Sequence, residues 1–166
     1  MVQLEKFKIK EDILRLISWV DSARLNIIWA SDKFNFPLDI NQLSNYLNNA
    51  DKNNIVIFKV VEITNNKAEV VGHAELDIFE TNIKISRLII DKKQRGKGYG
   101  EQMVKLLIKY IQENIKHTSI FLTVFTFNKP AITLYEKLGF ETVEIAPDFM
   151  RYKNEIWDRQ KMILKI

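Results

Sequence analysis

The order of apolar and polar positions divides the chain into strand-like and helix-like segments. Continuous or alternating apolar runs predict strands, and apolar residues repeated every three or four positions predict amphipathic helices. The first strand has a phase slip between Leu4 and Phe7, which indicates a bulge or a loose edge. Pro37 lies in a stretch, residues 24–40, that follows neither period. Strands are expected at 2–9, 55–63, 68–79, 83–90, 119–127, 140–146 and 157–166, and helices at 11–23, around 43–47, at 99–115 and at 128–138, with a loop at 147–155.

The connections between these segments predict the topology. Short polar turns at 64–67 and 80–82 join three strands into an antiparallel meander. The strand, helix and strand that follow form a unit whose two strands should run parallel with a right-handed crossover. No repeat or linker interrupts residues 1–166. We therefore expect one α/β (α+β) domain, with a mixed, mostly antiparallel central sheet of six to seven strands, one parallel crossover and about four flanking helices.

Composition narrows the classes of function. The chain of 166 residues has no cysteine, which excludes disulfides, a cysteine nucleophile and thiolate metal sites. No cluster of ligand residues indicates a metal, and no apolar run is long enough for a membrane span or a signal peptide, so a cytoplasmic protein is expected. The net charge of +4 is spread along the chain, so no nucleic-acid partner is expected. The densest basic patch is Lys92, Lys93, Arg95 and Lys97, which favours a small polyanion instead.

Three of the five glycines, Gly96, Gly98 and Gly100, lie close together between a predicted strand and a predicted helix. Without Cβ atoms the backbone there can turn sharply and bring its N–H groups close to a ligand. The N-terminus of the following helix attracts negative charge. The sequence therefore predicts an anion site in this loop, with a pyrophosphate as the natural ligand.

Together with the later segment VFTFNKPAITLYEKLGF, the loop RGKGYG resembles the GNAT superfamily of acetyl-CoA-dependent N-acetyltransferases. The family's first motif, Arg/Gln-x-x-Gly-x-Gly/Ala, is matched by Arg95, Gly98 and Gly100. Its second motif, an Asn followed seven residues later by a Tyr before Leu-Gly-Phe, is matched by Asn128 and Tyr135. Two motifs at this spacing around strands and helices are far more specific than one glycine-rich turn.

The resemblance implies the GNAT fold and acetyl-CoA as cosubstrate, without a metal. The backbone of Leu88, Ile89 and Ile90 would bind the pantetheine arm where two strands splay apart, and Arg95, Gly96, Lys97, Gly98, Tyr99, Gly100 and Glu101 would hold the pyrophosphate. Asn128 would contact the arm of the cofactor, and Tyr135 would lie near the sulfur. Segments 24–50 and 147–156 would frame the site of the acceptor.

The reaction implied by the resemblance is direct attack of an amine on the acetyl thioester. Tyr135 is predicted to be the general acid for the CoA thiolate, because a phenol suits a thiol leaving group. Some relatives place a Glu where this chain has Thr123, so the general base must be sought elsewhere. The candidates are Glu75, Asp77, Glu80 and His73; we favour Glu75, with solvated strand residues as the alternative interpretation.

Several alternatives stay open at this stage. The same fold also serves non-catalytic acyl-CoA-binding or regulatory domains, whereas a Rossmann or Walker nucleotide site disagrees with the glycine spacing. The acceptor is a small-molecule amine or a protein N-terminus or lysine, and a homodimer is compatible with the family. Four aromatic residues are expected in either the acceptor pocket or the core: Trp29, Phe34, Phe36 and Trp157. His117 is expected to have a structural role at a helix end.

Overall fold

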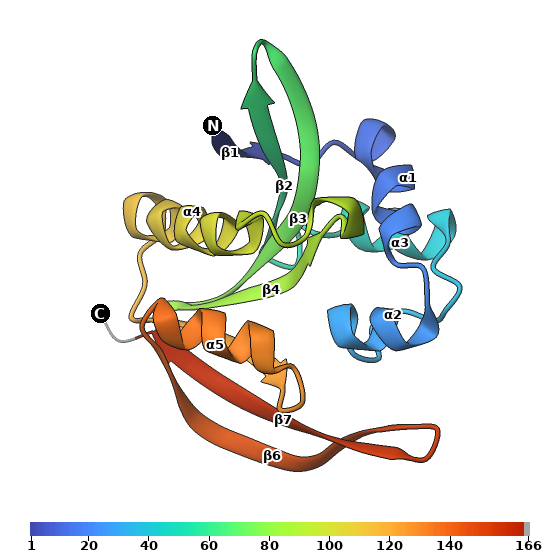
Figure 1. The fold of residues 1–166 in the computed structure, drawn as a ribbon, viewed down its shortest axis with the longest axis vertical. Coiled ribbons are helices and arrows are strands. Elements are labelled where there is room, and N and C mark those ends of the chain that lie inside the picture. The colour runs from blue at the N-terminus through green and yellow to red at the C-terminus, as the bar shows by residue number, and fades with distance from the viewer. Residues whose placement is uncertain (165–166) are drawn as a thin grey trace.

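The computed structural model describes residues 1–164 and shows one seven-stranded sheet with helices on both faces (Figure 1). The strand order is β1-β2-β3-β4-β5-β7-β6. The strands are β1 (Val2–Lys6), β2 (Ile55–Thr64), β3 (Lys67–Phe79), β4 (Asn82–Ile90), β5 (Ser119–Phe125), β6 (Phe140–Tyr152) and β7 (Glu155–Leu164). The helices are α1 (Ile9–Trp19), α2 (Ala23–Ala30), α3 (Ile40–Asn48), α4 (Tyr99–Asn114) and α5 (Lys129–Lys137), with a short 3-10 turn at Lys92–Gln94.

The predicted fold class is confirmed. Neighbouring strands pair antiparallel except β4 and β5, which are parallel, and α4 makes the crossover between them. The parallel pairing is short, because it joins only Asn82, Ile83 and Lys84 to Ser119, Ile120 and Phe121. Beyond Lys84 the two strands diverge, so the sheet splits open toward the end of β4.

Two apolar clusters hold helices against the two faces of the sheet. Helices α4 and α5 cover one face, where Leu107 and Ile132 pack with strand residues such as Ile85. Helices α1, α2 and α3 pack on the other face, where Leu16 and Leu43 belong to a second cluster. In Figure 1, α4 and α5 run across the sheet, and α1, α2 and α3 lie together at one side.

A bulge in β4 decides which face its last residues join. Glu75 pairs with Ser86 and His73 pairs with Ile89, so Arg87 and Leu88 both stand opposite Ala74. One extra residue reverses the alternation of side chains along a strand. Ile89 consequently belongs to the cluster of α1 to α3, although Ile83 and Ile85 belong to the cluster of α4 and α5.

Three local predictions were wrong near the N-terminus. Strand β1 lies at an edge of the sheet, but it has no bulge, because it pairs with β2 without a register shift; the phase slip marks the end of the strand and the start of α1. The predicted helix 11–23 ends at Trp19. Helix α2 then occupies part of the stretch 24–40, where it buries Asn26 and Trp29 together. A short helix with a buried polar residue shows no simple apolar stripe, but Ser22 accepts a hydrogen bond from the Leu25 N–H as an N-cap.

The predicted loop at 147–155 was also wrong. Strand β6 continues to Tyr152 and β7 begins at Glu155, so the loop is a long hairpin. The pairing shifts between Ala146 and Met150, and this irregularity accommodates Pro147, which has no N–H to donate to a regular ladder. Residues 165–166 of the predicted last strand lie outside the described residues. Within the described part of the chain, no helix has both the length and the apolar character to cross a membrane.

Candidate active site

The divergence of β4 and β5 opens a pocket of about 900 Å³. It extends from the glycine loop along β4 to the segment after α2. The walls come from β4, the start of α4, β5, α5, α2 and one residue each of β6 and β7. Elements that are far apart in the sequence therefore meet around one cavity.

The glycine loop forms one end of this pocket. Gly96 and Gly98 have φ values of 78° and 80°, which L side chains rarely adopt. Gly98 is the N-cap of α4 and supplies no side-chain cap, so N–H groups of the first helical turn lack intrahelical acceptors and can meet an anion. Arg95 also lines the pocket, and its Nε donates to the Ile90 carbonyl over 3.2 Å.

The remaining predicted residues of the loop lie differently. The side chain of Tyr99 is buried in the core, although the residue lines the pocket. Lys97 and Glu101 are not among the lining residues: the Lys97 ammonium donates to Gln94 Oε1, and Glu101 pairs with Lys105 and Lys137. Those hydrogen bonds lower the pKa of Glu101 to about 2. Any part of Glu101 in anion binding would therefore come from its backbone.

The bulge of β4 lies in the middle of the pocket wall. Arg87 has a φ of 47°, and its carbonyl accepts a hydrogen bond of 2.9 Å from the indole Nε1 of Trp29. Leu88, Ile89 and Ile90 follow along the same wall. A bulge leaves one backbone position outside the strand ladder, so this part of β4 can offer a backbone group to a ligand.

Helix α5 brings the second motif to the same pocket. Asn128 is its N-cap and accepts from the Ala131 N–H over 3.4 Å, and Pro130 occupies the first turn. Tyr135 lies two turns later, packed edge-on against Phe140, and lines the pocket. Its hydroxyl makes no hydrogen bond within residues 1–164. Burial raises the pKa of Tyr135 to about 12, so the phenol stays protonated at neutral pH.

Glu75 is completely buried behind the pocket wall and is not one of its lining residues. One carboxylate oxygen lies 2.9 Å from His73 Nε2, and the other accepts from the Tyr46 hydroxyl and from Arg87 Nε. Arg87 also donates to Asp77. Burial alone would raise the pKa of Glu75, but His73 and the charge of Arg87 outweigh it and hold that pKa below its usual value.

This network contains two residues that the sequence analysis missed. Tyr46 comes from α3, a helix whose position relative to β3 depends on the fold. Arg87 had a weak local signal, because it is a charged residue directly before the apolar run Leu88 to Ile90. With Glu75 and Asp77 as its acceptors and the Trp29 indole on its carbonyl, Arg87 is held from both ends.

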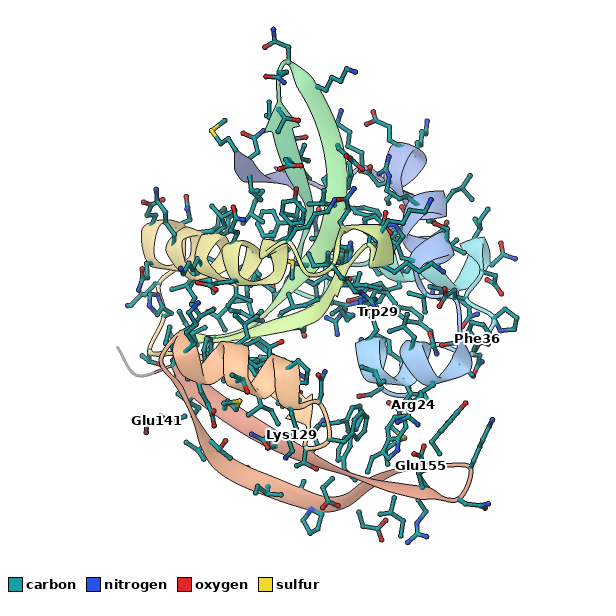
Figure 2. All side chains as sticks on the ribbon, in the orientation of Figure 1. Arg24, Trp29, Phe36, Lys129, Glu141 and Glu155 are labelled. Atoms are coloured by element: carbon teal, nitrogen blue, oxygen red, sulfur yellow. The ribbon has the colours of Figure 1, made fainter. Side chains whose placement is uncertain are left out.

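The other end of the pocket contains only part of the segments expected there. From 24–50 the lining residues fall within 25–33, and from 147–156 Phe149 alone contributes. Trp29 points from α2 toward β4, whereas Phe36 lies at the edge of the molecule (Figure 2). Phe34 and Trp157 are buried, Phe34 stacked on Trp29 at 5.7 Å.

His117 fits the structural role expected of it, since its Nδ1 lies 2.8 Å from the Ile115 carbonyl after α4. Thr123, where some relatives have a Glu, lines the pocket from β5. Among the described residues, no group of three or more acidic or histidine side chains is placed to hold a metal ion.

Comparison with known proteins identifies the family. The profile of the acetyltransferase (GNAT) family matches residues 23–140, more than half of the chain. A probable spermine N(1)-acetyltransferase of Bacillus subtilis subsp. natto is 36% identical over 83 residues, which cover 45% of this chain and 55% of the relative. The spermine/spermidine N(1)-acetyltransferase of Bacillus subtilis is 35% identical over 83 residues, which again cover 45% of this chain and 55% of the relative. The matched part thus spans little more than half the length of these relatives.

Solved structures show the same fold. Spermidine N-acetyltransferase from Vibrio cholerae, in complex with CoA and spermine, superposes with a TM-score of 0.84. The alignment covers 98% of this chain and 94% of that chain, at 19% sequence identity. At this level of identity the similarity establishes the architecture alone.

Proposed function

The chain belongs to the GNAT family of acetyltransferases, and from this premise we propose that it transfers the acetyl group of acetyl-CoA to a primary amine of a small molecule. One observation carries the proposal. The glycine loop, the β4 bulge and Tyr135 line a single continuous pocket, although they come from three separate elements. A cosubstrate site and a candidate acid are thereby adjacent to a space large enough for an acceptor.

The cosubstrate end suits a long molecule with a pyrophosphate. The N–H groups after Gly98 and the guanidinium of Arg95 provide donors and positive charge for the phosphates. Ile89 and Ile90 pair with β3 on one edge, while β5 has already diverged from the other edge. Backbone groups on that open edge can accept an extended pantetheine arm as an added strand. Asn128 keeps its amide NH₂ for the same arm.

The chemical step requires little from the side chains. The acetyl thioester supplies the electrophilic carbonyl; as the amine nitrogen bonds to it, the bond between carbon and sulfur breaks. The backbone at the Arg87–Leu88 bulge is our candidate for stabilising the carbonyl oxygen as it becomes negative. Tyr135 is our candidate acid, because its buried phenol is protonated and unpartnered and can donate to the departing thiolate.

The general base is assigned less directly. Glu75 as the base stays a prediction, and its burial and its three hydrogen-bond donors support a positioning role better. By accepting a hydrogen bond from Arg87, the Glu75 carboxylate positions Arg87 and therefore stabilises the bulge of β4. In that arrangement the acceptor loses its proton to solvent, so kcat/KM should rise with pH up to the pKa of the acceptor amine.

The candidate class of acceptor comes from the relatives. The relatives named above act on spermine or spermidine according to their names, which makes a polyamine one candidate. The non-catalytic alternative is favoured only by the absence of a Glu at Thr123.

Two measurements test the proposal. Acetyl-CoA at a hundredfold excess over its dissociation constant should stabilise the protein by about 2.7 kcal/mol in thermal unfolding. Release of free thiol should follow when an accepted amine is added, and the protein contributes no thiol background because it has no cysteine. The absence of any thermal shift with acetyl-CoA or CoA would refute the proposal. A shift without thiol release across a broad amine panel would favour the non-catalytic reading.

A further inference from the structure

The end of the pocket away from the glycine loop carries an excess of positive charge. Four basic residues line it, Lys33, Lys84, Arg87 and Arg159, and within the described chain Asp32 is the one carboxylate among the lining residues. Lys84 lies six residues before Ile90 on β4, a distance of about 20 Å along a strand. These charges therefore form a group separate from the phosphate donors of the glycine loop.

Most of this charge is not neutralised within the protein. Arg87 is paired with Glu75 and Asp77, but Lys33, Lys84 and Arg159 form no ion pair with any carboxylate of residues 1–164. Lys33 instead lies over the Tyr46 ring, and Arg159 lies 3.5 Å from the centre of the Phe149 ring. Contacts with ring faces keep a cation in place and leave its N–H groups available for an anion.

Lys84 is at the centre of the group. It stands directly opposite Asp77 in the pairing of β3 and β4, yet the Asp77 carboxylate accepts from Arg87. Burial lowers the pKa of Lys84; Asp77 opposes this effect, while Arg87, Arg159 and Lys33 add to it. An anionic ligand beside Lys84 would relieve this repulsion among like charges.

A second feature points to a ligand at the same place. Ser86 lies between Lys84 and Arg87 on β4, lines the pocket and is only 8% exposed. Its hydroxyl has no hydrogen-bond partner among the described residues. A buried polar group without a partner is costly, so the side chain is explained if a bound molecule supplies the partner.

The sheet places these groups on one face. Ser86 pairs with Glu75 and Lys84 with Asp77, so all four face the helices α2 and α3. Arg159 joins them from β7, next to a smaller pocket that Lys84, Thr123, Lys161 and Glu144 also line. Burial lowers the pKa of Arg159, and the charge of Glu144 opposes this effect. Within the described residues, Glu144 and Arg159 do not form an ion pair.

We propose that the acceptor is a small amine that also carries an oxyanion group, a carboxylate or a phosphate, bound by Lys84, Arg159 and the Ser86 hydroxyl. This inference rests on the proposed function and names its substrate class. A polyamine would bring further positive charge to this group of cations. A carboxylate or phosphate receives charge-assisted hydrogen bonds there, and Asp32 is placed on the same rim for the ammonium end.

Matched acceptors test the charge requirement directly. Free amino acids are compared with their amides, O-phosphoethanolamine is compared with ethanolamine, and spermidine serves as the polycation. In each pair the amine is retained and the anion is removed. Because the pKa of the amine differs between the two members of a pair, initial rates are compared at one pH above and one pH below the amine pKa. We expect kcat/KM to be at least tenfold higher for the anionic member of the preferred pair. The amino-acid and phosphate arms distinguish the two sources of the anion.

Substitutions locate the binding groups. Lys84→Met and Arg159→Met should raise KM for the anionic acceptor by about 10- to 100-fold, the usual effect of losing a hydrogen bond to a charged group. KM for acetyl-CoA should stay within twofold. Lys109→Met removes an exposed lysine of α4 that makes only a long contact with Glu113, and it is the matched control. Ser86→Ala should raise the same acceptor KM by a smaller factor.

Binding measurements make every outcome informative. Calorimetric titration of the CoA-bound protein with each acid and its amide should show binding of the acid that Lys84→Met weakens. Efficient acetylation of spermidine with no preference for the anionic members would overturn the inference while leaving the proposed function intact. So would variants of Lys84 and Arg159 with unchanged acceptor KM. Failure of acetyl-CoA itself to bind would instead overturn the proposed function.

Discussion

The two ends of the pocket are built from different parts of the polypeptide. At the cosubstrate end most of the proposed contacts are backbone groups, from the loop after Arg95, the bulge of β4 and its open edge, and the side chains of Arg95 and Asn128 add to them. At the acceptor end they are side chains, contributed by β4, β7 and the segment after α2. The first end depends on conformation within short stretches of chain. The second depends on how distant elements are placed against one another.

This difference explains how one fold can keep a cosubstrate and change acceptors. A backbone site tolerates many side chains as long as glycine and the strand geometry persist. A side-chain site changes its charge with single substitutions, and in this chain Lys84 and Arg159 give the proposed acceptor end positive charge. The following predictions separate the two ends by experiment.

Tyr135→Phe should give the largest effect. We expect kcat to fall about 1,000-fold, about 4 kcal/mol, because a general acid typically contributes two to four orders of magnitude. The phenyl ring still packs on Phe140, so the thermal shift with acetyl-CoA should be unchanged. Single-turnover thiol release and thermal unfolding measure the two quantities. Full activity of the variant would exclude Tyr135 as the acid.

Glu75→Gln should destabilise the fold by about 3 kcal/mol, because it leaves the buried charge of Arg87 with one carboxylate fewer. The folded pKa of Glu75 is lowered, so its contribution to stability is present above the unfolded pKa and is lost as pH falls through the folded pKa. The difference in the free energy of unfolding between variant and parent, measured with urea, should therefore be largest near pH 7 and become smaller at acidic pH.

The matched control for Glu75 is Glu113→Gln, an equal change of charge on the exposed side of α4. It should alter stability by well under 1 kcal/mol at either pH. If Glu75 is instead a direct base, Glu75→Gln will lower kcat/KM by about two to four orders of magnitude at pH values below the pKa of the acceptor amine in a variant that is still folded, and the positioning role will be contradicted.

Gly98→Ala should weaken acetyl-CoA binding about tenfold, because an L residue at positive φ costs about 1–2 kcal/mol and the loop must shift. KM for the acceptor should not change. Gly139→Ala is the matched control, since Gly139 also has positive φ but lies after α5 and outside the pocket lining. It should lower the melting temperature and leave KM for acetyl-CoA unchanged; an equal change of that KM in both variants would argue against a specific loop role.

Arg24→Ala should have the smallest effect. Arg24 on α2 pairs with Glu155 on the β6–β7 hairpin and stacks near Phe127 and Trp157, as Figure 2 shows for the ion pair. Exposed pairs contribute at most about 1 kcal/mol. We expect KM for the acceptor to rise less than threefold and KM for acetyl-CoA to stay constant. A double-mutant cycle with Glu155→Ala measures the coupling, and a large loss of acetyl-CoA binding would contradict the division of the pocket.

Most of the fold followed from local patterns, and the exceptions have identifiable causes. The meander and the parallel crossover were predicted from apolar runs and turns, and the pairing of the seven strands confirms them. Helix α2 was not predicted, because it buries Asn26 as well as Trp29 and therefore has no simple apolar stripe. Pro147 concealed the length of β6, because a register shift allows a proline that a regular strand excludes.

The candidate site divides along the same line. The sequence alone determined the glycine loop, Asn128 and Tyr135, since each depends on a spacing within one strand or helix and its neighbouring turn. Only the tertiary structure showed that Glu75 is buried under Arg87 and Tyr46, and that Lys84, Ser86 and Arg159 surround the same space. The physical reason is that burial and charge pairing arise between elements. A β bulge and a splayed pair of strands decide which side chains come into contact, and no local pattern in the sequence predicts those contacts.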